Sequence, residues 1–288
     1  MTTSPLPSAV YGLGIIGSRV ATRLADHGIP TITWNRTPRP GIHGIVATPA
    51  DAAQRARVHH IFVRDEAAVD MVLAGILPAL GAGHIVLVHA TVPQAAVQRW
   101  SAAVGATGAG FLDAPFTGSR GAAEAGNLVY YIGGDEAVLE QVRPNLLPSS
   151  KAILHLGPVG HAAVVKIATN MVTTAIVQAL AEAMAVTKSA GVDPALLLPA
   201  IANNGCRSGT SDLKLPAMLA GDFQPHFSLR NMLKDARFAA AIATVAGITL
   251  PAHAATTARM EAMAAIGGTI ADSDFSILAR QWDASPGN

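Results

Sequence analysis

The residue best suited to proton transfer in this sequence is Lys166. It lies in the stretch Ala162-Ala-Val-Val-Lys-Ile-Ala-Thr-Asn170, which is otherwise almost wholly apolar and is expected to be helical. Asn170 follows Lys166 by four residues, so the two side chains lie on one face of such a helix. A partly desolvated lysine has a lowered pKa and can donate a proton near neutrality. The alternative is a structural lysine whose stem packs on apolar neighbours while its ammonium reaches water.

A second candidate is the turn that follows an expected strand at Gly110–Asp113. It contains three small residues, Thr117, Gly118 and Ser119, and Arg120 comes next. The carboxyl ends of strands in a parallel sheet are where ligands bind. Hydroxyls and exposed N–H groups suit a carboxylate. We therefore expect this turn to hold the carboxylate of a small substrate, with Arg120 adding positive charge.

Three glycines in a G-x-G-x-x-G pattern, Gly12, Gly14 and Gly17, follow a short apolar run and precede a helical segment. In a dinucleotide-binding turn the first permits the tight turn, the second lets the backbone approach a pyrophosphate, and the third lets the helix pack closely. The helix N-terminus then offers free N–H groups to the phosphates. This context favours dinucleotide binding over a structural glycine turn. The expected cofactor contacts are Gly12, Leu13, Gly14, Ile15, Ile16 and Gly17.

The residues after the second expected strand, Asn35, Arg36 and Thr37, indicate which dinucleotide binds. An NAD site usually has an acidic residue here, which accepts hydrogen bonds from the ribose hydroxyls. Arg36 can instead bind a 2′-phosphate through its planar guanidinium, and Thr37 adds a hydroxyl. A charge-assisted bond of this kind contributes about 1.5–3 kcal/mol. The sequence therefore predicts NADP as the cofactor; the alternative is that Arg36 is an ordinary surface arginine.

The composition argues against several classes of protein. Half of the 288 residues are hydrophobic and 14% are charged, which suits a large buried core and argues against disorder. The net charge of +1 gives no sign of a nucleic-acid or membrane-surface partner. One cysteine allows no intrachain disulfide or cysteine metal site, and the ten histidines lack ligand spacing, so we expect no metal. The start of the chain lacks signal-peptide features, and we expect a cytoplasmic protein.

The first part of the chain alternates β-branched runs with alanine-rich helical stretches, the pattern of a mostly parallel, doubly wound sheet of Rossmann type. The expected strands are Ala9–Tyr11, Thr31–Trp34, Val58–Val63, Ile85–His89, Gly110–Asp113, Leu128–Ile132 and Ala152–His155. The expected helices are Ile15–His27, Pro49–Ala56, Glu66–Leu73 and Pro93–Ala103.

After Gly160 the strand signal stops and helical periodicity continues. We predict an NADP-binding Rossmann domain over residues 1–158 and an all-α substrate and dimerisation domain over residues 159–288. A long apolar helix from Gly160 to about Ala190 would join them; its polar residues favour a buried helix over a membrane span. Covering this helix favours a homodimer or homotetramer formed through the helical domain. The expected helix breaks are Gly191, Pro194, Pro216, Pro225, Gly247, Pro251 and Gly267–Gly268.

Together these segments resemble the β-hydroxyacid dehydrogenase family, which includes 3-hydroxyisobutyrate dehydrogenase, tartronate semialdehyde reductase and the glyoxylate/succinic semialdehyde reductases. The resemblance covers almost the whole chain in four ordered motifs. They are Gly12-Leu-Gly-Ile-Ile-Gly-Ser-Arg-Val-Ala21, Asp113-Ala-Pro-Phe-Thr-Gly118, Gly157-Pro-Val-Gly160 with Lys166 and Asn170, and Asp222-Phe223 with Lys234-Asp235.

The resemblance implies a Rossmann domain followed by an all-α domain. It also implies reversible hydride transfer between NADP(H) and a small 3-hydroxy acid or its semialdehyde. In this family Lys166 would be the general acid and base, and Asn170 would hold the substrate. The substrate-anchoring turn falls on Thr117, Gly118 and Ser119. Further cofactor contacts fall on Val63, Arg64, Thr91 and Lys234.

Some positions depart from the family pattern. His89-Ala-Thr91 stands where Asp-x-Ser-Thr is frequent, and Arg64 stands where a small or apolar residue is expected. Thr117 and Ser119 replace a serine and a glycine. These departures leave the substrate open, and His89 is interpreted as a polar loop residue.

Three alternatives to this function share parts of the pattern. Imine reduction on the same scaffold is disfavoured because imine reductases typically carry another residue in place of the lysine. A 6-phosphogluconate dehydrogenase is disfavoured by the length of this chain. A non-catalytic NADPH-binding protein is disfavoured because Lys166 and Asn170 are both present.

Overall fold

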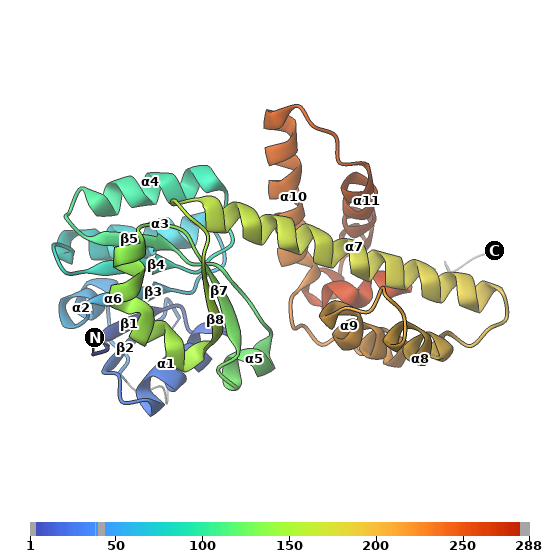
Figure 1. Cartoon of the computed structure of the whole chain (residues 1–288), viewed down its shortest axis with the longest axis horizontal. Coiled ribbons are helices and arrows are strands. Elements are labelled where there is room, and N and C mark those ends of the chain that lie inside the picture. Colours follow the sequence, from blue (N-terminus) through green and yellow to red (C-terminus); the bar gives the residue numbers. More distant parts are fainter. Residues whose placement is uncertain (1–3, 38, 40–43, 283–288) are drawn as a thin grey trace. The chain divides into compact units, whose positions relative to one another are not determined.

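The computed structural model describes residues 4–37, 39 and 44–282. It divides into two compact units, Met1–Lys166 and Ile167–Asn288, which we describe separately (Figure 1). The division falls inside one continuous helix, α7 (His161–Ser189). The predicted domain boundary at residues 158/159 therefore remains a prediction.

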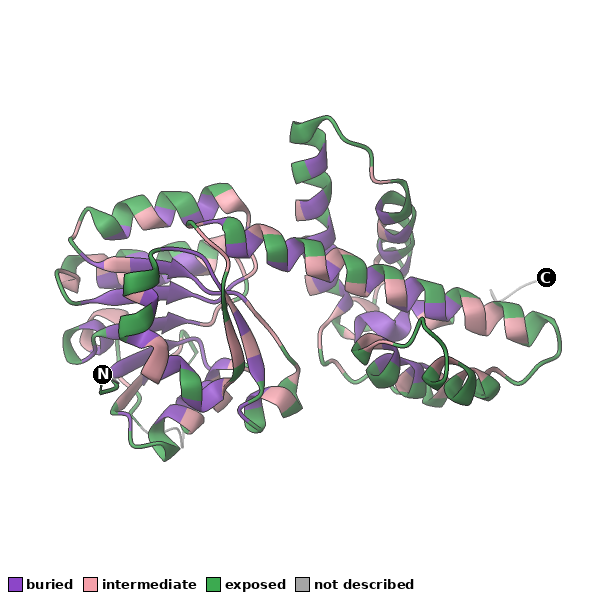
Figure 2. Cartoon of the chain, in the orientation of Figure 1, coloured by how far each residue is buried: buried purple, intermediate pink, exposed green. Residues whose placement is uncertain are grey.

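The described part of the first unit is built on a five-stranded parallel sheet with the order β2-β1-β3-β4-β5. Its three inner strands are buried on both faces (Figure 2), and one of them is the apolar, β-branched run Ile85–Val88. The chain passes from β1 to β2 on one side and to β3 on the other, so the order reverses between β1 and β3. The strands are β1 (Ser8–Tyr11), β2 (Thr31–Trp34), β3 (Val58–Ile61), β4 (Ile85–Val88) and β5 (Gly110–Asp113).

Helices cover both faces of this sheet, as the doubly wound pattern predicts. One core contains residues of α2, α3 and α4 together with Ala163 at the start of α7. The other contains residues of α1 and α6. The helices are α1 (Gly17–Asp26), α2 (Pro49–Arg55), α3 (Glu66–Ile76), α4 (Gln94–Gly105), α5 (Arg120–Glu124) and α6 (Glu136–Leu146).

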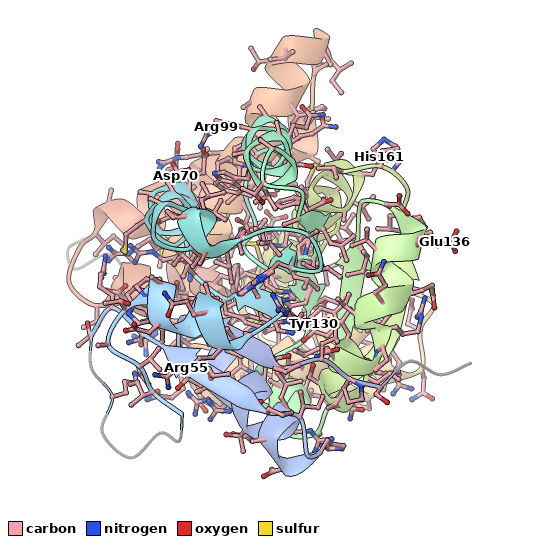
Figure 3. All side chains as sticks on the ribbon, turned by 90° about the vertical axis from the view of Figure 1, so that its left-hand side faces the viewer. Arg55, Asp70, Arg99, Tyr130, Glu136 and His161 are labelled. Atoms are coloured by element: carbon pink, nitrogen blue, oxygen red, sulfur yellow. The ribbon has the colours of Figure 1, made fainter. Side chains whose placement is uncertain are left out.

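Polar side chains fix the ends and edges of these helices. Thr48 and Asp51 form a capping box on α2, and Asp65 and Asp135 cap α3 and α6. On the outer surface, α3 and α4 are joined because a carboxylate oxygen of Asp70 accepts hydrogen bonds from Arg99 and Trp100 at 3.1 and 2.6 Å (Figure 3).

A second sheet departs from the single sheet expected from the sequence. It has the order β6-β7-β8, with β6 antiparallel to β7 and β7 parallel to β8. The strands β7 (Leu128–Ile132) and β8 (Ser150–His155) were expected as strands, but β6 (Phe116–Thr117) was not. Two residues are too few to show an alternating pattern. Helix α6 was not expected either, and it continues through Pro144.

The second unit is helical in its described residues, as expected. Buried residues of α7, α9, α10, α11 and the 3-10 segment Phe275–Trp282 form its core. Left-handed glycines, Gly221 and Gly247, end α9 and α10. The expected break at Pro216 is wrong, because α9 continues through it; proline removes only one of the helix's hydrogen bonds. The remaining helices are α8 (Leu197–Ala202), α9 (Gly209–Ala220), α10 (Leu229–Ala246) and α11 (Pro251–Ala265).

Helix α7 is long and apolar enough, by length and composition alone, to cross a membrane. Its most apolar window has a mean hydropathy of 1.4, and 44% of that window is buried in the described structure. Core helices of soluble proteins meet the same criteria, so α7 is weak evidence for a membrane span.

The main sheet contains two buried chains of histidines, one on each face. On one face the Arg57 guanidinium donates to His84, His84 Nδ1 lies 3.0 Å from His59 Nε2, and His59 Nδ1 lies 3.1 Å from the Tyr11 hydroxyl. Since arginine can only donate, His84 accepts from Arg57 and donates to His59, and His59 in turn donates to the Tyr11 hydroxyl. The spacing of these histidines in the sequence indicated only that they are unsuited to metal binding.

His89, expected as a polar loop residue, is instead only 3% exposed and belongs to the chain on the other face. Its Nδ1 donates to the carbonyl oxygen of Ala114 at 2.7 Å, so its Nε2 accepts from His60 Nδ1 at 3.1 Å. His60 Nε2 is buried without a hydrogen-bond partner among the described residues. The His89 ring also stacks on Phe62, with centroids 4.0 Å apart. His89 thus follows β4 outside the strand, as expected, but packing and these bonds bury it.

We predict that acid weakens the fold below pH 6.5. Burial lowers the pKa of both His59 and His89 from 6.5 to about 3, and it lowers the pKa of His60 well below its usual value. Below pH 6.5 these histidines therefore bind protons in the unfolded chain while they stay neutral in the folded protein. Protonation then favours the unfolded chain. Each of the first two residues should cost about 1.4 kcal/mol of unfolding free energy per pH unit well below 6.5.

Urea denaturation between about pH 8 and about pH 5 measures this loss, which should be small above 6.5 and steep below it. His27→Asn, which removes an exposed histidine outside both chains, is the control. An unfolding free energy that stays constant from 6.5 to about 5 would contradict the prediction.

Candidate active site

The three glycines after β1 answer different steric demands. Gly12 has φ +92°, and a Cβ there would lie 2.2 Å from the carbonyl oxygen of Phe62. A Cβ on Gly17 would lie 2.0 Å from the carbonyl oxygen of Gly12. Gly14 is exposed, and a Cβ there would meet no described atom within 4 Å. The first and third glycines therefore hold the strand–helix packing, whereas the second leaves an open approach to the backbone.

The N-terminus of α1 beside this loop is suited to an anion. Its N-cap residue, Ile16, makes no capping bond among the described residues, and the first turn contains no acidic side chain. In contrast, α2, α3 and α6 are capped by Thr48, Asp65 and Asp135. The open backbone at Gly14 and this uncapped helix end fit the pyrophosphate of a dinucleotide.

Asn35 joins the glycine loop to the end of β2. Its Oδ1 accepts a hydrogen bond from Leu13 N at 2.9 Å, and its Nδ2 donates to the carbonyl oxygen of Thr37 at 2.6 Å. Arg36 and Thr37 are exposed beside it. Residues 38 and 40–43 lie outside the described part of the chain. Asn35 therefore orders the segment that carries Arg36, a role the sequence did not indicate.

The remaining predicted cofactor residues of the first unit follow β3 and β4. Val63 is half-buried against the glycine loop, because a Cβ on Gly12 would lie 3.1 Å from its Cγ1. Arg64 is exposed and pairs with Asp65 at 3.2 Å. Thr91 is half-buried after β4. These segments belong to the same carboxyl edge as the glycine loop, where the strand order reverses.

Asp113, at the end of β5, holds the beginning of α7. Its two carboxylate oxygens accept hydrogen bonds from Gly160 N at 3.1 Å and Ala163 N at 3.0 Å. The side chain is fully buried. Burial raises the pKa of this carboxyl, and the backbone N–H bonds oppose the rise. In the sequence Asp113 belongs to one of the four motifs, which does not indicate this role.

The predicted substrate turn lies between β6 and α5. Thr117 ends β6, Gly118 has φ +139°, and Ser119 occupies the N-cap position of α5. A Cβ on Gly118 would lie 2.7 Å from Leu128 Cδ2, so a side chain there is disfavoured. Arg120, whose role was left open, is exposed in the first turn of α5.

Lys166 and Asn170 lie one turn apart in α7 and are 9% and 7% exposed. Asn170 belongs to the second unit, where its Nδ2 donates to Asp235 Oδ2 at 2.7 Å. The other oxygen of Asp235 pairs with Lys234 Nζ at 2.6 Å. Lys234 also lies 4.7 Å from the centre of the Phe238 ring. Asp235 therefore holds two predicted site residues, Asn170 and Lys234, a role that the sequence pattern does not indicate.

The predicted site residues thus form two groups. The first unit brings together the glycine loop, Asn35 to Thr37 and the ends of β3 and β4, and it also carries the substrate turn and Lys166. The second unit brings together Asn170 and Lys234. Among the described residues, no group of three His, Cys, Asp or Glu side chains could hold a metal ion.

Two family models match consecutive parts of the chain. Residues 8–157 match the family model for the NAD binding domain of 6-phosphogluconate dehydrogenase. Residues 160–282 match the model for the NAD-binding domain of NADP-dependent 3-hydroxyisobutyrate dehydrogenase.

Individual relatives align over nearly the whole chain. Glyoxylate/succinic semialdehyde reductase 2 of Arabidopsis thaliana is 28% identical over 93% of this chain and 76% of its own length. The 2-(hydroxymethyl)glutarate dehydrogenase of Eubacterium barkeri is 26% identical over 96% of this chain and 94% of its own.

The solved structure of Mycobacterium tuberculosis 3-hydroxyisobutyrate dehydrogenase with L-serine has the same fold. Its TM-score is 0.87 at 24% identity, and the match covers 98% of this chain and all of that one. The motifs, the fold and these matches together show that the chain belongs to the β-hydroxyacid dehydrogenase family of NAD(P)-dependent oxidoreductases.

Proposed function

We propose that the protein transfers hydride between NADP(H) and a small 3-hydroxy acid or its semialdehyde, with Lys166 as general acid and base. The observation that carries the proposal is the placement of Lys166 and Asn170. Both side chains are buried on one face of a continuous helix, and Asp235 orients the Asn170 amide. The relatives named above act on small semialdehydes and hydroxy acids, which supports this substrate class.

The protein's part in the reaction is to position the substrate and move one proton. The nicotinamide, when bound, supplies or accepts the hydride. During reduction Lys166 Nζ donates a proton to the carbonyl oxygen, and during oxidation it accepts the hydroxyl proton. Asn170, with one N–H held by Asp235, has its remaining N–H and its carbonyl oxygen to offer the substrate. Thr117, Gly118 and Ser119 bind the carboxylate.

NADP is the proposed cofactor because Arg36 and Thr37 are exposed at the end of β2. A carboxylate at position 35 would repel a 2′-phosphate, whereas Asn35 is neutral and is already bonded to Leu13 and Thr37. Its amide therefore shapes the loop that presents the Arg36 guanidinium to the phosphate.

Homo-oligomerisation through the helical unit also remains our proposal. Ile242, Val245 and Ile248, in or next to α10, are 38%, 91% and 55% exposed in the single chain. Burial of such side chains against a second copy would remove apolar surface from water.

Lys166→Ala should lower turnover by about 10²–10⁴-fold, because proton transfer contributes a factor of this size. NADPH binding, measured by fluorescence titration, should change little. The assay follows NADPH oxidation with succinic, methylmalonic and tartronic semialdehydes, glyoxylate and one cyclic imine. Turnover of the imine alone would favour an imine reductase, and binding without turnover of any carbonyl would favour a non-catalytic protein. A Lys166→Ala enzyme close to the wild-type rate would refute the role of the lysine.

Arg36→Ala should raise the Michaelis constant for NADPH by about ten- to a hundredfold, since a charge-assisted bond to phosphate is lost. The constant for NADH should stay nearly unchanged, because NADH lacks the 2′-phosphate. Steady-state kinetics with both cofactors measures the difference, and Arg55→Ala removes an exposed arginine of α2 as control. Equal effects of Arg36→Ala on the two cofactors would exclude a 2′-phosphate contact.

Gly14→Ala and Gly17→Ala should separate cofactor binding from folding. Gly14→Ala should fold normally, because the new methyl group meets open space. It should weaken NADPH binding by at least about tenfold, because the methyl group lies where the pyrophosphate approaches the backbone. Gly17→Ala should lower the melting temperature, because its methyl group meets the Gly12 carbonyl oxygen. Thermal unfolding and NADPH titration test both. If a folded Gly14→Ala protein has unchanged affinity for NADPH, the pyrophosphate does not bind at this loop.

A further inference from the structure

The beginning of α7 is held by a side chain from a distant strand. In a usual capping box the N-cap side chain accepts from the N3 backbone N–H, and the N3 side chain accepts from the N-cap N–H. Here those N–H groups belong to Gly160 and Ala163, whose side chains cannot accept a hydrogen bond. The Asp113 carboxylate accepts both bonds, at 3.1 and 3.0 Å. One residue of β5 therefore supplies both halves of the cap.

The surroundings leave space for this carboxylate. A Cβ on Gly133 would lie 2.2 Å from Asp113 Oδ1, so only glycine leaves the carboxylate in place. Backbone hydrogen bonds run both ways between Asp113 and Gly133, at 3.0 and 2.8 Å. Gly160 has φ +96°, and a Cβ there would lie 2.6 Å from Gln94 Cγ. A local N-cap side chain is thus sterically disfavoured at position 160.

We propose that Asp113 is a positioning residue for Lys166. The inference rests on the proposed function, in which Lys166 moves the proton. Lys166 follows Ala163 by three residues, which is about 4.5 Å along a helix axis and nearly the same face. A rigid first turn therefore sets the place of the Lys166 backbone relative to the sheet. A frayed first turn lets that backbone move.

The geometry also assigns Lys166 and Asn170 to different anchors. Lys166 lies in the first unit and is held through Asp113, whereas Asn170 lies in the second unit and is bonded to Asp235. Loss of the Asp113 cap should therefore disturb the lysine and leave the Asn170–Asp235 pair intact.

Asp113→Asn tests the proposal, because an amide of nearly the same shape can accept only one of the two bonds well. Hydrogen exchange, followed by mass spectrometry, should accelerate by at least about tenfold over residues 161–166, where the cap is lost. Exchange over residues 229–246 should not change. This measurement needs no substrate and no cofactor.

The kinetic readout uses the carbonyl with the highest wild-type rate. For Asp113→Asn we expect kcat to fall by about ten- to a hundredfold, since misplacement by about 1 Å costs this much. The NADPH dissociation constant should stay within about twofold, because the substitution removes no bond of the glycine loop. Asp135→Asn, the same substitution at the N-cap of α6, where one amide oxygen can still accept the single bond from Ala137 N, is the matched control and should leave kcat unchanged.

Gly133→Ala is the second variant, since its methyl group displaces the carboxylate without removing the charge. It should reproduce faster exchange at 161–166 and the lower kcat, and it keeps the test decisive if Asp113→Asn does not fold. Unchanged exchange, or faster exchange with unchanged kcat, would overturn the positioning role. If Lys166→Ala itself retains turnover, the proposed function fails instead. If Lys166→Ala loses turnover while Asp113→Asn keeps it, only this inference fails.

Discussion

The close approach of two backbones at the end of β1 is the constraint on which the nucleotide-binding unit depends. Gly12 lies against the carbonyl oxygen of Phe62, and Gly17 lies against the carbonyl oxygen of Gly12. Neither contact leaves space for a side chain. Because both residues are glycines, α1 begins directly over the point where the strand order reverses, with its N–H groups free of side-chain caps among the described residues. The tight packing of this helix on the sheet thus leaves an uncapped helix end at the loop proposed to bind the pyrophosphate.

A second theme is the use of buried carboxylates to hold the residues of the site. Asp113 binds the start of α7 from β5, and Asp235 binds Asn170 and Lys234 from α10. Asp274 of the second unit is a third buried carboxylate with several donors, but it holds no predicted site residue. It pairs with buried Lys214 at 2.7 Å and accepts the N–H groups of His226 and Phe227, in the segment that leads to α10. Each carboxylate has several donors, which offsets the cost of burying its charge.

Local patterns in the sequence predicted much of this molecule. Four of the five strands of the main sheet are short, largely apolar runs between polar or glycine-rich segments, and β3 contains His59 and His60; all five were expected within two residues of their ends. The glycine loop and the helical second half were also visible. What the sequence did not show depends on partners far along the chain. Asp113 bonds residues 47 and 50 positions away, and Asn170 bonds a residue 65 positions away. Hydrophobic periodicity along the sequence does not indicate such long-range bonds. The burial of His89 was not predicted for the same reason.

The two histidine chains make several interior positions interdependent in evolution. Each imidazole gives its hydrogen to the next group of its chain, and each except His60 also accepts one, so the rings of a chain share one direction. A single exchange to an apolar residue leaves the adjacent ring with a buried, unpaired atom, at a cost of about 1–3 kcal/mol. Exchange of all the histidines of a chain by apolar residues of similar shape leaves no unpaired ring atom. Relatives should therefore keep the histidines of a chain together or lose them together, and a sequence alignment would show these positions as a correlated group.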